Sequence, residues 1–531
     1  MTATDPRFPL ELPEVFNLCE YYLDHNLAAG RADKCAVVDE AGSWNYGQVH
    51  EQVRRMAIVL RDMGVRAEDR VLIVLPDALP FVTAFFGTLR VGGVFAMVNP
   101  LLKAADYAGY LQYTKARVVI THQSVMGEMA QAASEVGFPG SFLVVDGDGS
   151  SGHTNFAEAL AGANPDSPAA AMEPTGPDDL AGWLFTSGST GRPKACVHMH
   201  RDFAYSTETY AMQVVGYRED DVCVGVPKLF FGYATGTNLM FPFRVGATCV
   251  LFEGRSTADM LLDQIEAHKP TVMTGVPTLL NNMLRSDRVD SVDLSSLRLC
   301  LSAGEALPEQ VYTAWKERTG VEVLDGIGSA EMFHIYISNR PGDVRLGSLG
   351  RLVPGYWAEI LGADGEVLGK GKSGRLRIYG GSTAMCYWAN KPSSQETFQA
   401  EACTTADIFR EDEEGYFYYE GRSDDLLKVS GIWVSPLEIE NCLLSHECVA
   451  QVCVVGKEDS SGMVKPFAFI VPSAGQTGCD ELAEKLKAHI KERLAPYKYP
   501  RWFEWRDDLP KNDRGKVARA TLRSETESIP Q

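Results

Sequence analysis

A segment of small and hydroxylated residues that ends in a lysine carries the most specific chemistry in the sequence. It directly follows the apolar stretch WLF and reads Thr186, Ser187, Gly188, Ser189, Thr190, Gly191, Arg192, Pro193 and Lys194. Small residues let backbone N–H groups approach phosphate oxygens, and a lysine adds positive charge. Because Gly191 is followed by Arg and Pro, the segment is not a P-loop. It predicts a cradle for a polyphosphate, with a flexible Gly/Ser loop as the plainer alternative.

Further motifs with charged residues follow along the chain. They are DGIGSAE (325–331), TTADIF (404–409), GRSDD (421–425) and LPKNDRGK (509–516). Taken singly, Glu331 would more often be a solvated carboxylate, and Lys516 would be one surface lysine among many. The order of all these motifs resembles the adenylate-forming superfamily of acyl-CoA synthetases, luciferases and peptide-synthetase adenylation domains.

Other segments narrow the resemblance to the benzoate–CoA ligases, and the similarity runs nearly from end to end. They are KLFFGYATGTN (228–238), SAGEALPE (302–309), EMFHIYISNRPGDVR (331–345) and SDDLLKVSGIWVSPLEIE (423–440). The resemblance implies an acid–thiol ligase that uses ATP, Mg²⁺ and coenzyme A. It would convert benzoate or a substituted benzoate, for example 2-aminobenzoate or hydroxybenzoate, into an acyl-AMP with release of pyrophosphate. Transfer of the acyl group to coenzyme A would then give aryl-CoA and AMP.

Attack of a carboxylate on the α-phosphorus builds negative charge, which cations and hydrogen-bond donors must stabilise. Glu331 matches the family's magnesium-binding glutamate, a hard oxygen ligand suited to that ion. Lys516 matches the catalytic lysine that bridges the attacking carboxylate and the α-phosphate. The resemblance therefore implies that Glu331 and Lys516 are the catalytic residues.

The resemblance also implies a nucleotide site. Asp407 matches the acid that accepts hydrogen bonds from both ribose hydroxyls, and Arg422 the guanidinium beside it. Asp325 would lie beside the adenine amino group. The remaining residues of the expected ATP and AMP site, besides the segment from Thr186 to Lys194, are Ala303, Gly304, Glu305, Gly326, Ile327, Ala330 and Tyr419.

Flat apolar and aromatic walls are expected around the ring of the acid. The residues implied are Phe230, Phe231, Tyr233, Ala234, Ala303, Ile327, Gly328, His334 and Ile335. Seen alone, such an aromatic string is more often ordinary core, and the position of the motifs favours the pocket instead. His334 could equally be a satisfied core histidine. Lys228 and Lys498 could attract a carboxylate or the phosphates of coenzyme A, or simply be solvated.

The sequence departs from the family pattern at several positions. Ala330 stands where relatives carry a threonine whose hydroxyl donates to the α-phosphate. The absence of this hydrogen bond should cost about 1 kcal/mol. Ala195 and Ala406 replace glycines, which is harmless only where φ is negative. Arg514 replaces a threonine. Retention of Lys194, Glu331, Asp407, Arg422 and Lys516 nevertheless favours an active enzyme.

The elements that position these residues are read from hydrophobic periodicity. Between about residues 35 and 300, apolar runs such as RVLIV alternate with helical stretches such as ALPFVTAFFGTLR, which predicts parallel sheets covered by helices. We therefore expect an α/β fold with a large N-terminal domain of doubly wound sheets (1–423) and a small mobile α+β domain (424–531).

The Gly-, Ser- and Pro-rich stretch 147–179 reads as a surface connection. Asp424 matches the family's hinge, and its turn would bring Ser430, Gly431 and Trp433 towards the pantetheine channel.

Composition limits the partners. The formal net charge of −20 argues against a nucleic-acid partner. No run of 18 apolar residues and no basic, apolar start is found, so no membrane association is expected and the cytoplasm is the expected location. The 12 cysteines form no CxxC pair and read as buried reduced thiols. A homodimer is left open.

Rival functions share the same first half-reaction or the same site. A stand-alone adenylation enzyme would load the aryl group onto a carrier protein. Thioester formation with free coenzyme A would distinguish a CoA ligase from such an enzyme. A luciferase-like oxygenase would consume oxygen or emit light. A degenerate acid or nucleotide sensor, suggested by Ala330, would release no pyrophosphate.

Overall fold

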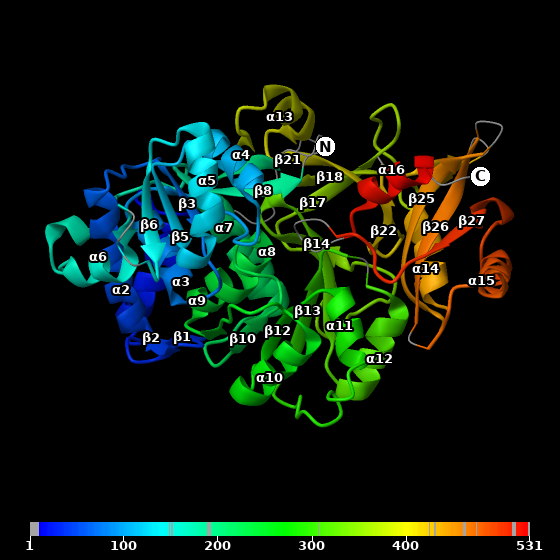
Figure 1. Cartoon of the computed structure of the whole chain (residues 1–531), viewed down its shortest axis with the longest axis horizontal. Coiled ribbons are helices and arrows are strands. Elements are labelled where there is room, and N and C mark those ends of the chain that lie inside the picture. Colours follow the sequence, from blue (N-terminus) through cyan, green and yellow to red (C-terminus); the bar gives the residue numbers. More distant parts are fainter. Residues whose placement is uncertain are drawn as a thin grey trace.

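The chain is described by a computed structural model that covers residues 10–147, 149, 152–187, 193–305, 307–423, 425–429, 432–459, 463–473, 475–511 and 517–528. In Figure 1 the blue to green N-terminal part forms the bulk of the molecule, and the orange and red C-terminal part lies at its right-hand side. The predicted α/β class, with a large sheet-containing N-terminal domain and a smaller C-terminal one, is confirmed.

An eight-stranded sheet is built from short apolar strands whose alternate residues face opposite sides. In strand β3, Val71 and Ile73 join one hydrophobic cluster, whereas Leu72 and Val74 join another. In sheet order the strands from β8 to β7 are parallel, and β9 and β19 extend one edge as antiparallel neighbours. In sheet order they are β19 (Cys386–Tyr387), β9 (Pro193–Met199), β8 (Leu180–Ser187), β4 (Val94–Met97), β3 (Arg70–Val74), β5 (Val118–His122), β6 (Ser141–Val145) and β7 (Thr154–Asn155).

A nine-stranded sheet follows the same rule, because Leu299 and Leu301 of β13 face one cluster and Cys300 faces another. The strands between β1 and β14 in the sheet are parallel, and antiparallel strands lie at both edges. In sheet order they are β16 (Arg351–Leu352), β15 (Ile335–Ser338), β14 (Val323–Gly328), β13 (Leu299–Ala303), β12 (Val272–Gly275), β10 (Val222–Gly225), β11 (Thr248–Val250), β1 (Cys35–Asp39) and β2 (Gly42–Asn45).

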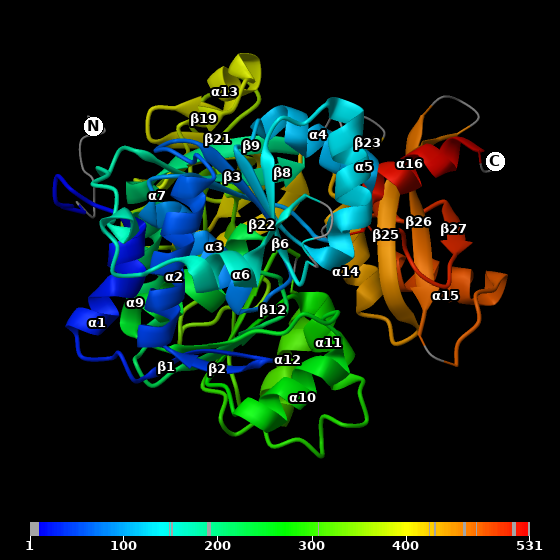
Figure 2. The same ribbon diagram turned by 60° about the vertical axis from the view of Figure 1, so that its left-hand side comes forward.

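Helices cover both faces of these sheets, as the two views show (Figures 1 and 2). Helices α10 to α12 pack on one face of the nine-stranded sheet, and α4 and α5 pack on the outer face of the eight-stranded sheet. Helices α2 and α3 fill the layer between the sheets. The helices of the N-terminal part are α1 (His25–Ala28), α2 (Tyr46–Asp62), α3 (Leu79–Arg90), α4 (Ala104–Thr114), α5 (Met126–Val136), α6 (Phe156–Gly162), α7 (His200–Ser206), α8 (Gly232–Thr235), α9 (Phe241–Val245), α10 (Ala258–His268), α11 (Pro277–Leu284), α12 (Glu309–Thr319) and α13 (Lys391–Thr397).

An antiparallel five-stranded sheet leads from the large sheets to the C-terminal part. Its strands are β17 (Trp357–Leu361), β18 (Ser373–Tyr379), β20 (Phe398–Gln399), β21 (Ala402–Glu411) and β22 (Phe417–Arg422). The C-terminal elements are β23 (Leu427–Val429), β24 (Ile432–Val434), α14 (Pro436–Leu444), β25 (Val449–Glu458), β26 (Val464–Pro472), α15 (Asp480–Arg493), β27 (Trp502–Trp505) and α16 (Arg519–Ser528). This part has hydrophobic clusters of its own.

The stretch 147–179 contains more structure than its composition suggests. Strand β7 pairs with β6 and extends the eight-stranded sheet, and helix α6 follows it directly. Phe156 and Leu160 of this helix are buried. The prediction that the whole stretch is a surface connection was therefore wrong, because two suitably spaced apolar residues are enough to pack a short helix against the core. Among the described residues, no helix has the length and apolar character needed to cross a membrane.

Candidate active site

A cavity of about 1630 Å³ lies where the large sheets, the five-stranded sheet and the C-terminal part meet. Its walls include β-strand ends from each of these sheets and residues of α14 and α15. The residues expected from the sequence that line this cavity are Thr186, Lys194, Lys228, Phe230, Phe231, Tyr233, Ala303, Gly304, Glu305, Asp325, Gly326, Ile327, Gly328, Ala330, Glu331, His334, Ile335, Asp407, Tyr419 and Arg422. Residues far apart in sequence are thus brought to one place.

The expected phosphate segment connects adjacent antiparallel strands. β8 ends at Ser187, β9 begins at Pro193, and Thr186 lies opposite Lys194 in the ladder. Gly188, Ser189, Thr190 and Gly191, which carry the rest of this prediction, lie outside the described residues, as does the side chain of Ser187. The ammonium group of Lys194 lies 5.0 Å from the centre of the Tyr387 ring. The strand pair therefore holds the lysine at the cavity wall.

Glu331 lies in a single 3₁₀ turn, Ala330–Met332, that follows the end of β14. Tyr387 donates a hydrogen bond of 2.6 Å to its Oε1 atom, and the backbone N–H of Ala384 donates to its carbonyl at 2.8 Å. On the other side, His198 Nε2 lies 2.7 Å from the Ala330 carbonyl oxygen. A carboxylate is thereby fixed at the cavity wall.

The expected adenine residues lie at the ends of neighbouring parallel strands. Ser302 pairs with Asp325 and Ala303 with Gly326 between β13 and β14. Asp325 is 5% exposed, and burial raises the pKa of its carboxyl to about 7. Its Oδ1 atom has no hydrogen-bond partner among the described residues. A buried acceptor of this kind is suited to a donor on a ligand.

The expected ribose residues are cross-strand neighbours in the β21–β22 hairpin. Asp407 lies opposite Arg422, and Arg422 Nη1 is 3.8 Å from Asp407 Oδ1. Tyr419, on the same hairpin, packs on Phe409 with ring centres 5.4 Å apart. The hairpin thus presents an acid and a guanidinium together.

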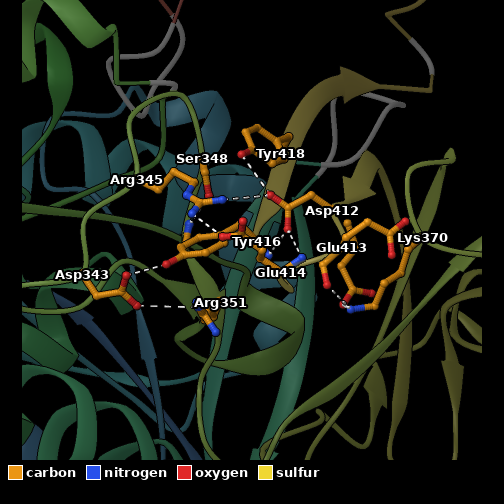
Figure 3. A network of polar contacts seen from close by, with 12 residues as sticks. Asp343, Arg345, Ser348, Arg351, Lys370, Asp412, Glu413, Glu414, Tyr416 and Tyr418 are labelled. Atoms are coloured by element: carbon orange, nitrogen blue, oxygen red, sulfur yellow. Dashed lines mark hydrogen bonds and ion pairs between the residues drawn. The ribbon is translucent and has the colours of Figure 1, made fainter.

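A polar network holds the turn at the far end of this hairpin (Figure 3). Arg345 pairs with Asp412 at 3.4 Å and with Glu414, and its guanidinium carbon lies 3.8 Å from the centre of the Tyr416 ring. Arg351 lies 4.2 Å from the centre of the same ring. Because Arg345 belongs to the loop after β15, the network ties the hairpin to the strand that follows the Glu331 turn.

The expected acid pocket is lined by rings. Phe230 and Phe231 lie 4.3 Å apart between ring centres just before α8, whose first turn contains Tyr233. His334 Nε2 donates to the Tyr233 carbonyl at 3.0 Å, and burial lowers the pKa of this histidine to about 3. The imidazole is therefore neutral at physiological pH. The Tyr233 hydroxyl and His334 Nδ1 have no partner among the described residues.

Not every expected residue is placed. Ala234 is fully buried in α8 and is not among the lining residues, so its pocket role stays a prediction. Lys516, Asp424, Ser430 and Gly431 lie outside the described residues, as does the Trp433 side chain. Lys511 and Val517, which bracket 512–516, both line the cavity. Ala195 and Ala406 lie in strands and are not among the residues with positive φ, so the backbone there does not require glycine.

Tyr387, His198 and Asp202 were not predicted from the sequence. Tyr387 comes from the two-residue strand β19, and no local pattern marks it. His198 and Asp202 are spaced four residues apart across the start of α7, and the bond between His198 Nδ1 and Asp202 Oδ2 is 2.9 Å. That spacing was the one available signal for the pair.

Comparison with known proteins decides the family. The model described as "AMP-binding enzyme" matches residues 24–388, and that of the "AMP-binding enzyme C-terminal domain" matches residues 438–516. The chain belongs to the AMP-binding enzyme family. The resemblance inferred from its motifs is thereby confirmed, and relatives place this AMP-binding enzyme in the benzoate–CoA ligase family.

Among these relatives, the benzoate–CoA ligase of Thauera aromatica is 43% identical over 517 residues, which cover 97% of each chain. The 4-hydroxybenzoate–CoA/benzoate–CoA ligase of Rhodopseudomonas palustris is 38% identical and covers 96% of this AMP-binding enzyme and 94% of its own length. The structure of the anthranilate CoA ligase AuaEII with anthranoyl-AMP has a TM-score of 0.92 at 37% identity, covering 97% of this chain and 98% of its own. The benzoate CoA ligase structure from Burkholderia xenovorans has a TM-score of 0.89 at 40% identity, covering 96% and 100%.

Proposed function

We propose that this AMP-binding enzyme is an ATP-dependent aryl acid–CoA ligase. It activates benzoate or a substituted benzoate as the acyl-AMP, releases pyrophosphate, and passes the acyl group to coenzyme A. The observation that carries the proposal is the meeting of Lys194, the Asp407–Arg422 pair and the Tyr233–His334 wall in one cavity. Cationic, diol-binding and aromatic surfaces in one cavity suit a nucleotide and an aryl acid held together.

The first half-reaction joins a carboxylate oxygen of the acid to the α-phosphorus of ATP and breaks the bond to pyrophosphate. In the proposal, Lys194 stabilises the departing phosphates, and Asp407 and Arg422 hold the ribose. Lys516 supplies positive charge between the carboxylate and the α-phosphate. Preorganised charges of this kind stabilise a transition state without reorganising during the reaction.

The magnesium ion of the proposal would be held mainly by the phosphates. Among the described residues, no group of three or more His, Cys, Asp or Glu side chains could hold a metal. Mg²⁺ commonly takes one or two carboxylates together with substrate phosphates, so the lone Glu331 carboxylate fits it. When bound, the ion would neutralise charge on the phosphates.

The coenzyme A step depends on the C-terminal part. We propose that the chain divides into residues 1–423 and 424–531 and turns about Asp424, so that Lys516 leaves and the segment of Ser430, Gly431 and Trp433 approaches the pantetheine. Residues of the C-terminal part, including Pro436, Asn441 and Val517, line the cavity in this structure. That arrangement supports a state prepared for adenylation.

The acid specificity is tested by pyrophosphate release from ATP and Mg²⁺ with a panel of acids. Benzoate, aminobenzoates and hydroxybenzoates should outperform acetate and palmitate. Apolar pockets separate such analogues by about 1–3 kcal/mol, so several aryl acids should react. A preference for palmitate would overturn the assignment of the pocket at Phe231 and Tyr233.

A second experiment tests the catalytic lysine and the acceptor. Lys516→Ala should lose acyl-AMP synthesis from the free acid while folding normally, and undiminished synthesis would overturn its proposed role. Thioester formation with free coenzyme A separates this function from loading of a carrier protein. Size-exclusion chromatography with light scattering would decide whether the enzyme is a homodimer.

A further inference from the structure

The turn that presents Glu331 is held on one side by a buried histidine–aspartate pair. His198 Nδ1 lies 2.9 Å from Asp202 Oδ2, and His198 Nε2 lies 2.7 Å from the Ala330 carbonyl oxygen. Both side chains are at most 2% exposed. A carbonyl oxygen only accepts hydrogen bonds, so Nε2 carries the proton and donates to the residue immediately before Glu331.

The segment from Ser382 to Tyr387 holds the same turn on the other side. The Ser382 hydroxyl donates to the Met332 carbonyl at 2.9 Å, and the Ala384 N–H donates to the Glu331 carbonyl at 2.8 Å. Tyr387 donates to the Glu331 side chain itself at 2.6 Å. Each carbonyl of the turn is therefore bonded, and so is one carboxylate oxygen.

The backbone leaves this turn through a strained residue. Phe333 has φ 62° and ψ −57°, and the His334 N–H donates to the Met332 carbonyl at 2.8 Å, which closes a γ-turn around Phe333. A bulky residue in this conformation costs about 1–3 kcal/mol and persists only where its surroundings impose it. Phe333 is 2% exposed and packs on Phe203 with ring centres 4.5 Å apart. The geometry around Glu331 is thus imposed by packing.

Tyr387 contacts both charged groups that the proposal places at the phosphates. Its hydroxyl bonds to Glu331, and its ring centre lies 5.0 Å from the Lys194 ammonium group. The contact with Lys194 follows from the sheet, because Tyr387 lies opposite Cys196, two residues after Lys194 on β9. Tyr387 is 6% exposed, and because a carboxylate oxygen only accepts hydrogen bonds, the tyrosine hydroxyl is the donor to Glu331.

We propose that Tyr387 is a positioning residue that fixes the rotation of the Glu331 carboxylate, so that Oε2 is directed to the phosphate-bound cation while Oε1 is held by the tyrosine. The proposal rests on the proposed role of Glu331 as a cation ligand. Partners that orient a metal ligand typically change metal affinity about 10- to 100-fold when removed. Tyr387 does not itself touch the reacting atoms in this proposal.

The test uses Tyr387→Phe, which removes only the hydroxyl and keeps the ring over Lys194. Binding of ATP to the full-length enzyme is measured by calorimetry at increasing Mg²⁺ in the absence of acid and coenzyme A. In Tyr387→Phe, the Mg²⁺ concentration at which the affinity for ATP has increased by half of its full amount should rise about tenfold. The affinity for ATP without Mg²⁺ should stay unchanged.

Matched variants make the result decisive. Tyr379→Phe removes an equivalent hydroxyl that donates to Glu359 at 2.8 Å outside the cavity, and it should leave the Mg²⁺ dependence unchanged. In a Glu331→Gln background, adding Tyr387→Phe should cause no further rise, because residues that act as a unit are not additive. An unchanged Mg²⁺ dependence in Tyr387→Phe, or a protein that does not fold, would overturn the positioning role. If Glu331→Gln itself left the Mg²⁺ dependence unchanged, the proposed function of Glu331 would fail instead.

Discussion

Asp407 and Arg422 face each other on adjacent strands, with 3.8 Å between the carboxylate and the guanidinium. The aspartate side chain is 15% exposed and the arginine 47%, so the acid is fixed in the wall while the arginine reaches solvent. A partly exposed ion pair of this length contributes little to the free energy of unfolding. Substitutions here therefore report on ligand binding more than on folding.

Asp407→Ala should raise the KM for ATP at least tenfold, because the ribose would lose hydrogen bonds to a charged group worth about 1.5–3 kcal/mol each. The melting temperature should change little. Steady-state pyrophosphate release at varied ATP measures the effect, with Glu359→Ala, which removes the partner of Arg377 outside the cavity, as the control. An unchanged KM for ATP would place the ribose elsewhere.

Asp325 should make ATP binding depend on pH near neutrality. Burial raises the pKa of this carboxyl to about 7, so the carboxylate forms as the pH rises through that value. An ionised acceptor binds the adenine amino group more strongly, and the KM for ATP should fall from about pH 6 to about pH 8. Asp325→Asn should flatten this profile, and parallel profiles for the two proteins would contradict the assignment.

The same group has an opposite effect on folding stability. A folded-state pKa above the unfolded value means that the folded protein binds the extra proton between about 4 and 7, so stability falls as the pH rises through that window. Asp325→Asn should remove this contribution. Denaturant unfolding of both proteins at low and neutral pH measures it.

Ala330→Thr should leave the enzyme active or make it up to about tenfold faster, because the added hydroxyl can donate to the α-phosphate. Ala330 lines the cavity, and its carbonyl is already held by His198. Single-turnover formation of the acyl-AMP is the measurement. A well-folded but inactive variant would mean that the phosphate is held differently.

Gly236→Ala should weaken binding of the aryl acid more than binding of the nucleotide. An added Cβ would lie 2.5 Å from His334 Cδ2 and 2.6 Å from Nε2, so the imidazole must shift. The KM for the aryl acid should rise severalfold while the KM for ATP stays nearly unchanged. Gly109→Ala, in helix α4 where a Cβ meets nothing within 4 Å, is the control and should leave both constants unchanged. Equal rises in both constants would indicate general damage.

Sequence patterns predicted elements whose signal is local. The run RVLIV became β3, and LPFVTAFFGTLR became α3. The site residues came from motif resemblance, and the structure gathers most of the described ones at one cavity. The Tyr387–Glu331 bond joins residues 56 positions apart, and its existence depends on how the sheets assemble. Hydrophobic periodicity cannot predict such a contact between distant residues. The Gly-, Ser- and Pro-rich composition of the stretch 147–179 likewise gave no indication of helix α6.

The reversed backbone at Phe333 separates Glu331, the proposed cation ligand, from His334, which the proposal places beside the ring of the acid. Lengthening or shortening this loop would displace both at once. We therefore expect new acid preferences to be acquired by exchanging single side chains such as Tyr233 or Ile335, and insertions between Glu331 and His334 to abolish turnover for every acid alike.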